Sequence, residues 1–399
     1  MTRRNALRIV NNWDVIVVGV GAVGSAVLRS GSEAGARVLG IEQFMPAHTR
    51  GSSHGHSRIF RHAYFERPDY VPLLRHSTAR FESLQRESGA MLLNRCGMLV
   101  AGRDDSAVVR GTLASARQWG LPVEALDAPA LRSRFPLFSF PDDSFGAFEA
   151  NAGIVRPEAA VNASVEVARA RGATLRTSCR VLGVTEDTNG VSVATDQGTE
   201  RASALIITAG AWASRLLPEL SPLLTVTRQV QAWIAPAEGA DATRMPCWLF
   251  DRDPGCRALY GLAPDPSAPA SSSGHPSPSR HPKVAFHGSD LVVDPDLGAP
   301  PVADSDVNRL LDAYRAIAPA LAGTLVEAAT CLYTMSPDGH FLVGTRHGSR
   351  RTHFAAGLSG HGFKLAPALG DALADLALQG RTELPIGFLS PARFARTSP

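Results

Sequence analysis

The segment WDVIVVGVGAVGSAV, from Trp13 to Val27, joins an apolar run to the glycine spacing GxGxxG. The run up to Gly19 has the character of a buried parallel strand, and the residues after the glycines favour a helix. Gly19 permits a tight turn, Gly21 lets the backbone approach a pyrophosphate, and Gly24 allows close helix packing. Amide groups at the helix N-terminus favour a bound anion. The segment therefore predicts a dinucleotide site, the alternative being a glycine-rich turn in an ordinary βαβ unit.

A second strand is predicted from Arg37 to Ile41, and Glu42 follows it directly. An acidic side chain at this point can hydrogen-bond a ribose hydroxyl and would repel a phosphate at the 2′ position. These features do not distinguish NAD from FAD, so later segments have to decide between them.

The strand and helix pattern returns twice. Strands are predicted over 174–187 and 191–195, around an Asn-Gly turn, and from Ala204 to Gly210. Near the end, a strand from His353 to Gly357 precedes a helix from Lys364 to about Leu378. A nucleotide domain that resumes at the C-terminus favours FAD, whose long body reaches into a second domain, by analogy with flavoproteins.

The length and composition indicate an α/β protein of two domains. A chain of 399 residues exceeds the size of one core. We expect a Rossmann-like FAD-binding domain of residues 1–90, 150–222 and 325–399, and an antiparallel-sheet substrate domain of residues 91–149 and 223–324. Within the latter, a helix is predicted from Asp105 to Trp119, and the Pro/Ser-rich stretch 263–282 is predicted to be a mobile surface loop that buries no apolar surface.

Charge and cysteine content limit the partners. The net charge of +3 is spread along the chain, without the basic run interleaved with aromatics that a nucleic-acid groove needs. No apolar stretch has the length of a membrane span, and residues 1–12 lack the pattern of a signal peptide. The odd number of widely spaced cysteines indicates reduced thiols in the cytoplasm, without metal-ligand spacing. These are Cys96, Cys179, Cys247, Cys256 and Cys331.

Lysine is nearly absent from the chain. Of the 40 basic side chains, only Lys283 and Lys364 are lysine and the rest are arginine. Because arginine replaces most surface lysines, a retained lysine marks a place where a compact, tunable ammonium is needed, although two can also remain by chance. Both are therefore candidates for chemistry.

Four segments place further candidates near these lysines. Thr49 to Tyr64 reads TRGSSHGHSRIFRHAY, and a helix beginning near Ser57 would put Arg58 and Arg61 on one face. Taken alone, such a segment is more often a solvated basic turn. The remaining segments are YG…KVAFH with Tyr260, Lys283 and His287, AGTLVEAATCLYT with Cys331 and Tyr333, and SGHGFK with His361 and Lys364.

Together these segments resemble the monomeric sarcosine oxidase and N-methyltryptophan oxidase family, FAD enzymes of the wider D-amino-acid-oxidase-like group. The resemblance runs from about Trp13 to Phe394. It implies that Cys331 carries the flavin through an 8α-S-cysteinyl link, where a lone strand cysteine is otherwise a small buried hydrophobe. Covalent attachment withdraws electrons and favours oxidation of a carbon–nitrogen bond.

The resemblance also implies roles around the flavin. Lys283 would hold a water at the reactive flavin nitrogen and stabilise charge as dioxygen is reduced, rather than pointing to solvent from its strand. Arg61 and Lys364 would grip a substrate carboxylate. Arg58 and His54 would lie against the flavin ring. The substrate cavity would be lined by Tyr260, His287 and Tyr333, although each of these three could equally be a satisfied core residue. The cofactor would be contacted by Gly19, Gly21, Gly24, Glu42, Val181, Gly210 and His361.

Two departures from the family pattern stand out. Position 56 is His where the family is expected to carry Asp, which makes the flavin edge less negative and pH-dependent. The loop before Lys283 is also longer than the family's short turn, so its alignment rests on the local KVAFH match.

The chain is thus expected to be a cytoplasmic, monomeric oxidase of secondary or N-methyl amino acids. The neutral amine gives a hydride equivalent to FAD, the imine hydrolyses, and dioxygen becomes hydrogen peroxide. The alternatives are a non-covalent amino-acid oxidase, a dehydrogenase that passes electrons to another acceptor, and a non-catalytic flavin-binding protein. Nucleic acid, membrane and metal are not expected as partners.

Overall fold

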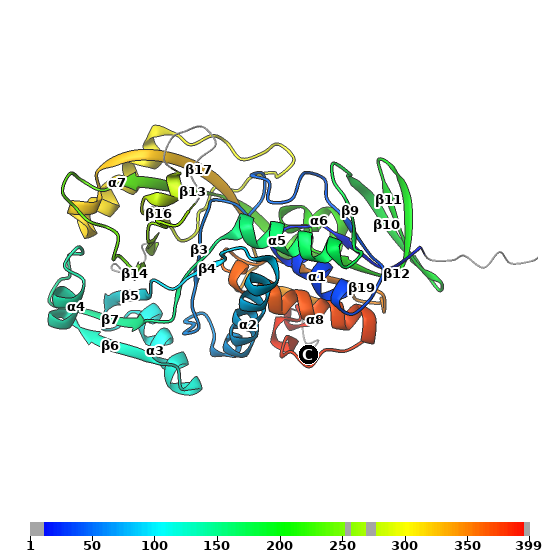
Figure 1. The fold of residues 1–399 in the computed structure, drawn as a ribbon, viewed down its shortest axis with the longest axis horizontal. Coiled ribbons are helices and arrows are strands. Elements are labelled where there is room, and N and C mark those ends of the chain that lie inside the picture. The colour runs from blue at the N-terminus through cyan, green and yellow to red at the C-terminus, as the bar shows by residue number, and fades with distance from the viewer. Residues whose placement is uncertain (1–11, 252–256, 269–276, 395–399) are drawn as a thin grey trace, which may run out of the picture.

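The computed structural model describes residues 12–251, 257–268 and 277–394 (Figure 1). Two eight-stranded sheets lie at opposite ends of the molecule, and a three-stranded sheet connects the segments between them. The α/β fold with a Rossmann-like part and a second sheet domain is thereby confirmed.

The first sheet has the parallel arrangement that the glycine-rich segment predicts. Strand β1 pairs in parallel with β2 and β12, and β12 pairs in parallel with β19. The parallel strands are β1 (Trp13–Val18), β2 (Val38–Ile41), β9 (Thr174–Arg176), β12 (Gly198–Ile207) and β19 (Thr352–Ala356), and the antiparallel additions are β10 (Val181–Asp187), β11 (Gly190–Thr195) and β18 (Leu342–Thr345).

Four helices accompany this sheet. Helix α1 packs against both α5 and α8, and its buried face carries small and apolar residues that let the helices approach. These helices are α1 (Ala22–Glu33), α2 (Val71–Ser88), α5 (Pro157–Ala170) and α8 (Ala366–Gln379). The short helix α6 (Ala213–Leu216) follows a 3-10 turn at Gly210–Trp212.

The second sheet has the strand order β17-β13-β16-β15-β14-β5-β7-β6. It is antiparallel except where β14 runs parallel to β5. Its strands are β5 (Met98–Arg103), β6 (Val123–Asp127), β7 (Ser144–Glu149), β13 (Thr225–Ala235), β14 (Cys247–Asp251), β15 (Leu259–Leu262), β16 (Lys283–Phe286) and β17 (Thr324–Met335). The helices beside it are α3 (Ala107–Trp119), α4 (Ala128–Arg134) and α7 (Asp304–Ile317).

One expected domain boundary is wrong. Residues 325–335, which we assigned to the FAD-binding domain, form β17 and pair with β13 along its whole length. The two long strands extend from the second sheet toward the first (Figure 1). A strand that crosses between domains carries no local signal of which sheet it joins, because pairing is set by distant partners.

The expected helix near Ser57 is also wrong. Arg58–Phe60 is strand β3, which pairs with β8 (Gly153–Val155), and β8 pairs with β4 (Leu93–Asn94). The spacing of Arg58 and Arg61 therefore does not place them on one helical face. Tertiary pairing with a distant strand decided the conformation here.

Other elements match the sequence closely. The helices predicted after Gly21, from 105 to 119, and after Lys364 are present, the last beginning at Ala366 after a 3-10 turn. The strand predicted over 174–187 is two strands, because the chain leaves β9 and begins β10 at Val181.

The stretch 263–282 is more buried at its described ends than predicted. Ala263 and Ala268 are buried, and the Asp265 carboxylate lies 2.6 Å from the Arg156 guanidinium. The prediction that this stretch buries no apolar surface is therefore wrong there. Residues 269–276 and the first eleven residues lie outside the described part of the chain.

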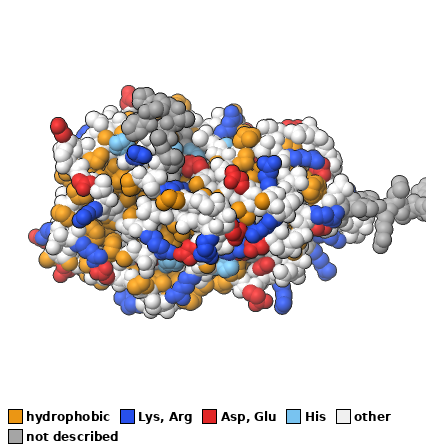
Figure 2. Space-filling model, viewed as in Figure 1, with side chains coloured by type: hydrophobic (Ala, Val, Ile, Leu, Met, Phe, Trp, Pro, Cys, Tyr) orange, Lys and Arg blue, Asp and Glu red, His pale blue; other side chains and the backbone are white. Residues whose placement is uncertain are grey.

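The surface mixes charges of both signs on the face shown in Figure 2. Across the described residues, no helix combines the length and the apolar character needed to cross a membrane.

Candidate active site

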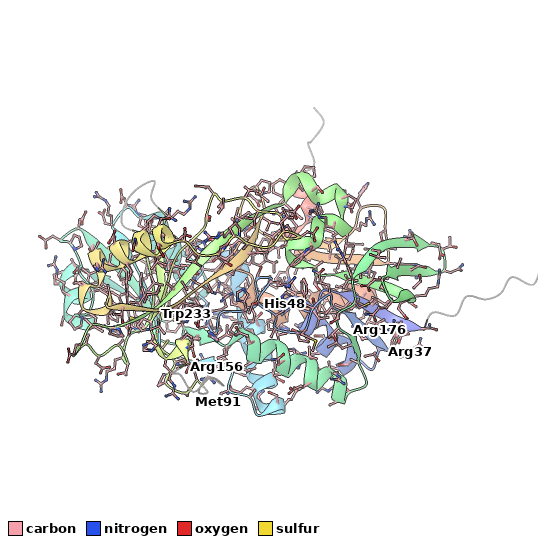
Figure 3. The ribbon with its side chains drawn as sticks, turned by 90° about the horizontal axis from the view of Figure 1, so that it is seen from above. Arg37, His48, Met91, Arg156, Arg176 and Trp233 are labelled. Atoms are coloured by element: carbon pink, nitrogen blue, oxygen red, sulfur yellow. The ribbon has the colours of Figure 1, made fainter. Side chains whose placement is uncertain are left out.

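A cavity begins where β1, β2 and α1 meet and extends to the face of the second sheet. Seen from above, Arg37 and Arg176 lie on the side of the first sheet and Trp233 lies in the second sheet (Figure 3). His48, which lines the cavity, lies between them. Thirteen predicted site residues line it: Gly19, Gly21, Glu42, Arg58, Arg61, Val181, Gly210, Tyr260, Lys283, His287, Tyr333, His361 and Lys364. Gly24, His54 and Cys331 do not.

The glycines form a close cradle at one end of the cavity. A Cβ at Gly24 would lie 1.9 Å from the Gly19 carbonyl oxygen, so this position admits no side chain. Gly19 has φ of 85°, in the left-handed region that favours glycine. Gly21 is the N-cap of α1 and offers no side chain of its own, and the Ala22 amide donates to the Ser53 hydroxyl at 3.1 Å. The positive end of the helix dipole at this point favours an anion.

Glu42 lies at the end of β2, buried at the cavity wall. Its carboxylate accepts hydrogen bonds from the Val20 amide at 2.7 Å and the Phe44 amide at 3.0 Å. These bonds hold the carboxylate beside the glycine turn, where the sequence placed a ribose partner.

The cavity fits an elongated dinucleotide. One cavity includes this cradle, Lys283 and Lys364, and residues of both large sheets line it. Within the described part of the chain, the buried Thr334 hydroxyl on its wall has no hydrogen-bond partner. An unpartnered buried hydroxyl is costly unless a bound group satisfies it. The residues present therefore suit FAD.

Arg61 is buried at the far end and already has a partner. Its Nη2 lies 2.7 and 2.8 Å from the two carboxylate oxygens of Glu66, and its Nη1 donates to the Ala63 carbonyl. Burial acts to raise the pKa of Glu66, but Arg61 and the surrounding groups outweigh it and lower that pKa to about 2. A substrate carboxylate would therefore meet Arg61 in competition with a charged Glu66.

Lys364 is buried beside this pair. Its Nζ donates to the His361 carbonyl at 3.0 Å and lies 5.2 Å from the centre of the Tyr64 ring. Burial and then the Arg61 charge lower the pKa of Lys364 to about 7, while Glu66 opposes them. A second carboxylate in the cavity would raise that pKa and keep the lysine charged.

The hydrogen bonds of His361 define its neutral form. Its Nε2 lies 2.9 Å from the Gly339 carbonyl, so this nitrogen carries the proton and Nδ1 accepts from the Tyr64 hydroxyl at 2.6 Å. Burial lowers the pKa of His361 to about 3, in agreement with an uncharged ring.

Lys283 reaches from β16 to the segment that contains His54. Its Nζ donates to the carbonyls of Gly55 at 2.9 Å and Ser57 at 2.5 Å. Burial, with a contribution from Arg58, lowers the pKa of Lys283 well below its ordinary value. The lysine is therefore buried on the cavity wall, and does not point to solvent.

Arg58 and His54 differ in their relation to the cavity. Arg58 lines it, donates to the Ser57 and Ser52 carbonyls, and contacts no carboxylate among the described residues. His54 is buried behind the wall, where burial and the Arg58 charge lower its pKa to about 4. Arg58 is thus an available cation, and His54 a neutral side chain that packs behind it.

Three rings surround the remaining space. The His287 ring lies 6.3 Å from both the Tyr260 and the Tyr333 ring, measured between centroids. Burial lowers the pKa of His287 and raises that of each tyrosine. All three are neutral at neutral pH, so this wall combines apolar area with hydrogen-bonding groups.

Cys331 occupies β17 between the cavity and a second hollow. It is buried and lines the second hollow, whereas Tyr333 lines the main cavity and Leu332, between them, lines both. Burial raises the pKa of the Cys331 thiol, although Arg58 and Lys283 oppose this. Its sulfur is thus within the electrostatic reach of the candidate site.

Sequence reasoning missed two carboxylates. Glu66 follows Arg61 by five residues, a signal that was available. Glu158, in the first turn of α5, accepts hydrogen bonds from the Gly55 amide at 2.6 Å and the His56 amide at 3.0 Å. His56 itself has φ of 65° and packs its ring against Trp233 at 5.5 Å. No local pattern links residue 158 to this distant segment.

The fold and the cavity define a flavin-dependent oxidoreductase. The chain belongs to the FAD dependent oxidoreductase family, whose pattern matches residues 14–376. It is 40% identical over 388 residues to the monomeric sarcosine oxidase of Streptomyces avermitilis, covering 96% of this chain and 98% of that protein. The predicted family resemblance is thereby confirmed.

Two further similarities bear on the site. An N-methyl-L-tryptophan oxidase of Salmonella agona is 37% identical over 390 residues, covering 97% of this chain and 99% of that one. The open form of NikD, an unusual amino acid oxidase essential for nikkomycin biosynthesis, superposes with a TM-score of 0.81 at 27% identity, covering 96% and 98% of the two chains.

Proposed function

We propose that this protein oxidises secondary or N-methyl amino acids with FAD and dioxygen, releasing hydrogen peroxide. The observation that carries the proposal is the buried pair Arg61 and Lys364 at the end of the cavity opposite the glycine cradle. Sarcosine oxidase and N-methyltryptophan oxidase are the names of its relatives, which supports the same substrate class.

The charges at this end favour a carboxylate ligand. Arg61 and protonated Lys364 contribute two positive charges against the negative charge of Glu66, and Arg58 nearby is opposed by Glu158. In a buried site such an excess of positive charge is costly until an anion binds. The carboxylate of an amino acid would supply that anion between Arg61 and Lys364.

The amine would then lie near Tyr260, His287 and Tyr333. None of these rings is a strong base at neutral pH, because burial lowers the pKa of the histidine and raises those of the tyrosines. The substrate therefore reacts with its own amine neutral. When bound, FAD supplies the two-electron acceptor for the carbon–hydrogen bond beside that nitrogen. The imine product hydrolyses in water.

Lys283 is proposed to assist the reduction of dioxygen. Its position on the cavity wall, fixed by the carbonyls of Gly55 and Ser57, suits a group that stabilises negative charge as it develops. Negative charge nearby would raise the lowered pKa of Lys283 and keep it protonated when it is needed.

We further propose a covalent flavin at Cys331 and a monomeric, cytoplasmic enzyme. Cys331 directly precedes Leu332 and Tyr333, which line the cavity, and the charges of Arg58 and Lys283 act to lower the pKa of its thiol against the effect of burial, which supports the first. The name of the Streptomyces relative supports the second, and four described cysteines that are free thiols suit a reducing compartment. Acid precipitation tests the link, since a covalent flavin stays with the pellet. Size-exclusion chromatography tests the monomer.

The decisive experiment pairs two half-reactions. Anaerobic mixing with an N-methyl amino acid should bleach the flavin, while the corresponding amine without a carboxylate should do so far more slowly. Admission of air should then give one hydrogen peroxide per flavin reduced. Bleaching without peroxide would indicate a dehydrogenase, and no bleaching with any amine acid would indicate a flavin-binding protein without turnover.

A further inference from the structure

Two cysteines meet where β14 begins, inside the second sheet. The Sγ atoms of Cys96 and Cys247 are 3.8 Å apart, although 150 residues separate them along the chain. No other sulfur–sulfur contact occurs among the described cysteines. We propose that Cys96 and Cys247 form a modification site, a dithiol that hydrogen peroxide converts into a reversible disulfide.

The backbone around the pair is arranged for a disulfide. Cys247 begins β14 and pairs with Met98 of β5, and its amide donates to the Gly97 carbonyl at 3.0 Å. Cys96 is therefore one residue from a direct backbone contact with Cys247. Bond formation requires the sulfurs to close to about 2.05 Å, a movement of about 1.8 Å that side-chain rotation and a small shift before β5 can supply. Gly97, at φ of 82°, lies at the point that would move.

The two thiols differ in a way that suits stepwise oxidation. Cys96 is half-buried, and the hydrogen bond from Cys247 lowers the pKa of its thiol. Cys247 is fully buried, and burial raises the pKa of its thiol. The thiolate is the form that peroxide oxidises, so Cys96 is the residue attacked and Cys247 the residue that resolves the product.

The pair also lies close to the place where the proposed function generates peroxide. Met98, which faces Cys247 across the strand pair, and Leu249 line the candidate active site, and both pack in the same cluster as the two cysteines. The source of the oxidant rests on the proposed oxidase activity. The dithiol itself rests on the geometry and would react equally with added peroxide.

The chemistry balances in two steps. The Cys96 thiolate attacks one oxygen of hydrogen peroxide, the O–O bond breaks, and hydroxide leaves and takes up a proton as water, so that sulfur is oxidised to a sulfenic acid and peroxide is reduced. Cys247 then loses its proton and attacks the Cys96 sulfur, the S–S bond forms, and the S–O bond breaks to release a second water. A thiol reductant reverses the change.

The test uses the flavin-loaded protein without an amine substrate. All samples carry Cys256→Ser, because that residue lies outside the described part of the chain. Brief treatment with hydrogen peroxide should lower the intact mass by about 2 Da, the two hydrogens lost from a dithiol, and dithiothreitol should restore it. Peptide mapping without reductant should join the peptides that contain residues 96 and 247.

Matched variants separate the two roles. Cys247→Ser should leave Cys96 as a sulfenic acid that dimedone labels, and Cys96→Ser should show neither label nor disulfide. Cys179→Ser should behave as the parent protein does. The site is overturned if Cys96 stays reduced after treatment with hydrogen peroxide, or if it stays reduced after treatment with the general thiol oxidant diamide. A disulfide that joins Cys96 to a different cysteine would also overturn it.

A second arm tests the source of the oxidant. Turnover of an N-methyl amino acid in air should form the same disulfide, and catalase in solution should protect less well against peroxide from turnover than against added peroxide, because Met98 and Leu249, which pack beside the dithiol, line the cavity. If added peroxide forms the disulfide while turnover does not, the dithiol stands and its supply by the enzyme's own reaction is refuted.

Discussion

The two ends of the cavity are built in different ways. At the cofactor end, Gly19, Gly21, Gly24 and Glu42 all lie within one βαβ unit, and backbone atoms fix nearly every contact. At the substrate end, the side chains come from elements far apart in sequence and form a charged network around Arg61. The cofactor end is therefore rigid and is built from residues close together in the sequence. The substrate end depends on opposite charges that balance one another.

This difference predicts how each end fails when it is changed. A side chain added at the cofactor end meets backbone that cannot move, so the whole holoenzyme should be lost. A charge removed at the substrate end leaves the fold intact and alters binding, pH dependence or one half-reaction. The predictions below test this contrast in order of decreasing effect.

Gly24→Ala should have the largest effect. The added Cβ would lie 1.9 Å from the Gly19 carbonyl oxygen, a backbone atom that no rotamer change can move away. Overpacking of this kind costs at least about 1–3 kcal/mol, and here it also displaces the turn that receives FAD. We expect almost no flavin to copurify and a lower thermal unfolding midpoint. The control is Gly183→Ala on β10, where a Cβ meets no atom within 4 Å; equal flavin content in both variants would contradict the rigid cradle.

Lys283→Met should separate the two half-reactions. A buried cation that stabilises developing charge contributes about a hundredfold to a rate. Flavin reoxidation by dioxygen should therefore slow by about that factor, while anaerobic reduction by substrate changes little. Stopped-flow absorbance measures both steps, and an equal loss in both would remove Lys283 from the oxygen reaction.

Lys364 should set the pH dependence of carboxylate binding. Its pKa of about 7 means that the free enzyme holds a charged lysine below pH 7 and loses that charge as the pH rises. The dissociation constant of a simple carboxylate inhibitor should therefore increase above about pH 7. Lys364→Met should weaken binding by roughly tenfold to a hundredfold at low pH, the value of a charged hydrogen bond.

Lys364→Arg provides the matched control for that pH profile. Arginine stays charged across the range, so its binding curve should be flat where the parent curve bends. A bend that persists in the arginine variant would assign the titration to another group. Flavin absorbance titrations give all three curves.

Much of the cofactor end could be predicted from the sequence, because a strand, three glycines and an acid follow one another within about thirty residues, as such units do. The substrate end could be predicted only in part. Arg61 and Lys364 were identified through the family resemblance, but the partner Glu66 was not, and the helix expected at Ser57 is a strand. Pairing with β8 and the carboxylate of Glu158 are long-range effects, which no local periodicity reveals.

Glu66→Gln should tighten carboxylate binding by a few-fold. The variant removes the charge that competes for Arg61 and leaves the guanidinium ready for a ligand. The measurement belongs at pH 6, because Glu66 also raises the pKa of Lys364 and its loss would lower that value. Glu238→Gln, at an exposed position, should change nothing. Weaker binding in the first variant would instead make Glu66 the residue that positions Arg61.

Glu158→Gln should have the smallest effect, and it tests whether the substrate end extends to the segment that holds Lys283. The charge of Glu158 raises the pKa of Lys283 against the effect of burial, so its removal lowers that pKa further. Under the role proposed for Lys283, the protonated lysine assists the oxygen reaction, so the rate of flavin reoxidation should begin to fall at a lower pH than in the parent enzyme. Glu166→Gln, at an exposed position on the same helix, should leave the profile unchanged.

A glutamine side chain at position 158 still offers an oxygen to the Gly55 and His56 amides, so the segment keeps its place and a shifted profile reports charge alone. If the pH profile of reoxidation does not shift, Glu158 acts only by holding the Gly55 and His56 amides, and its charge does not influence Lys283.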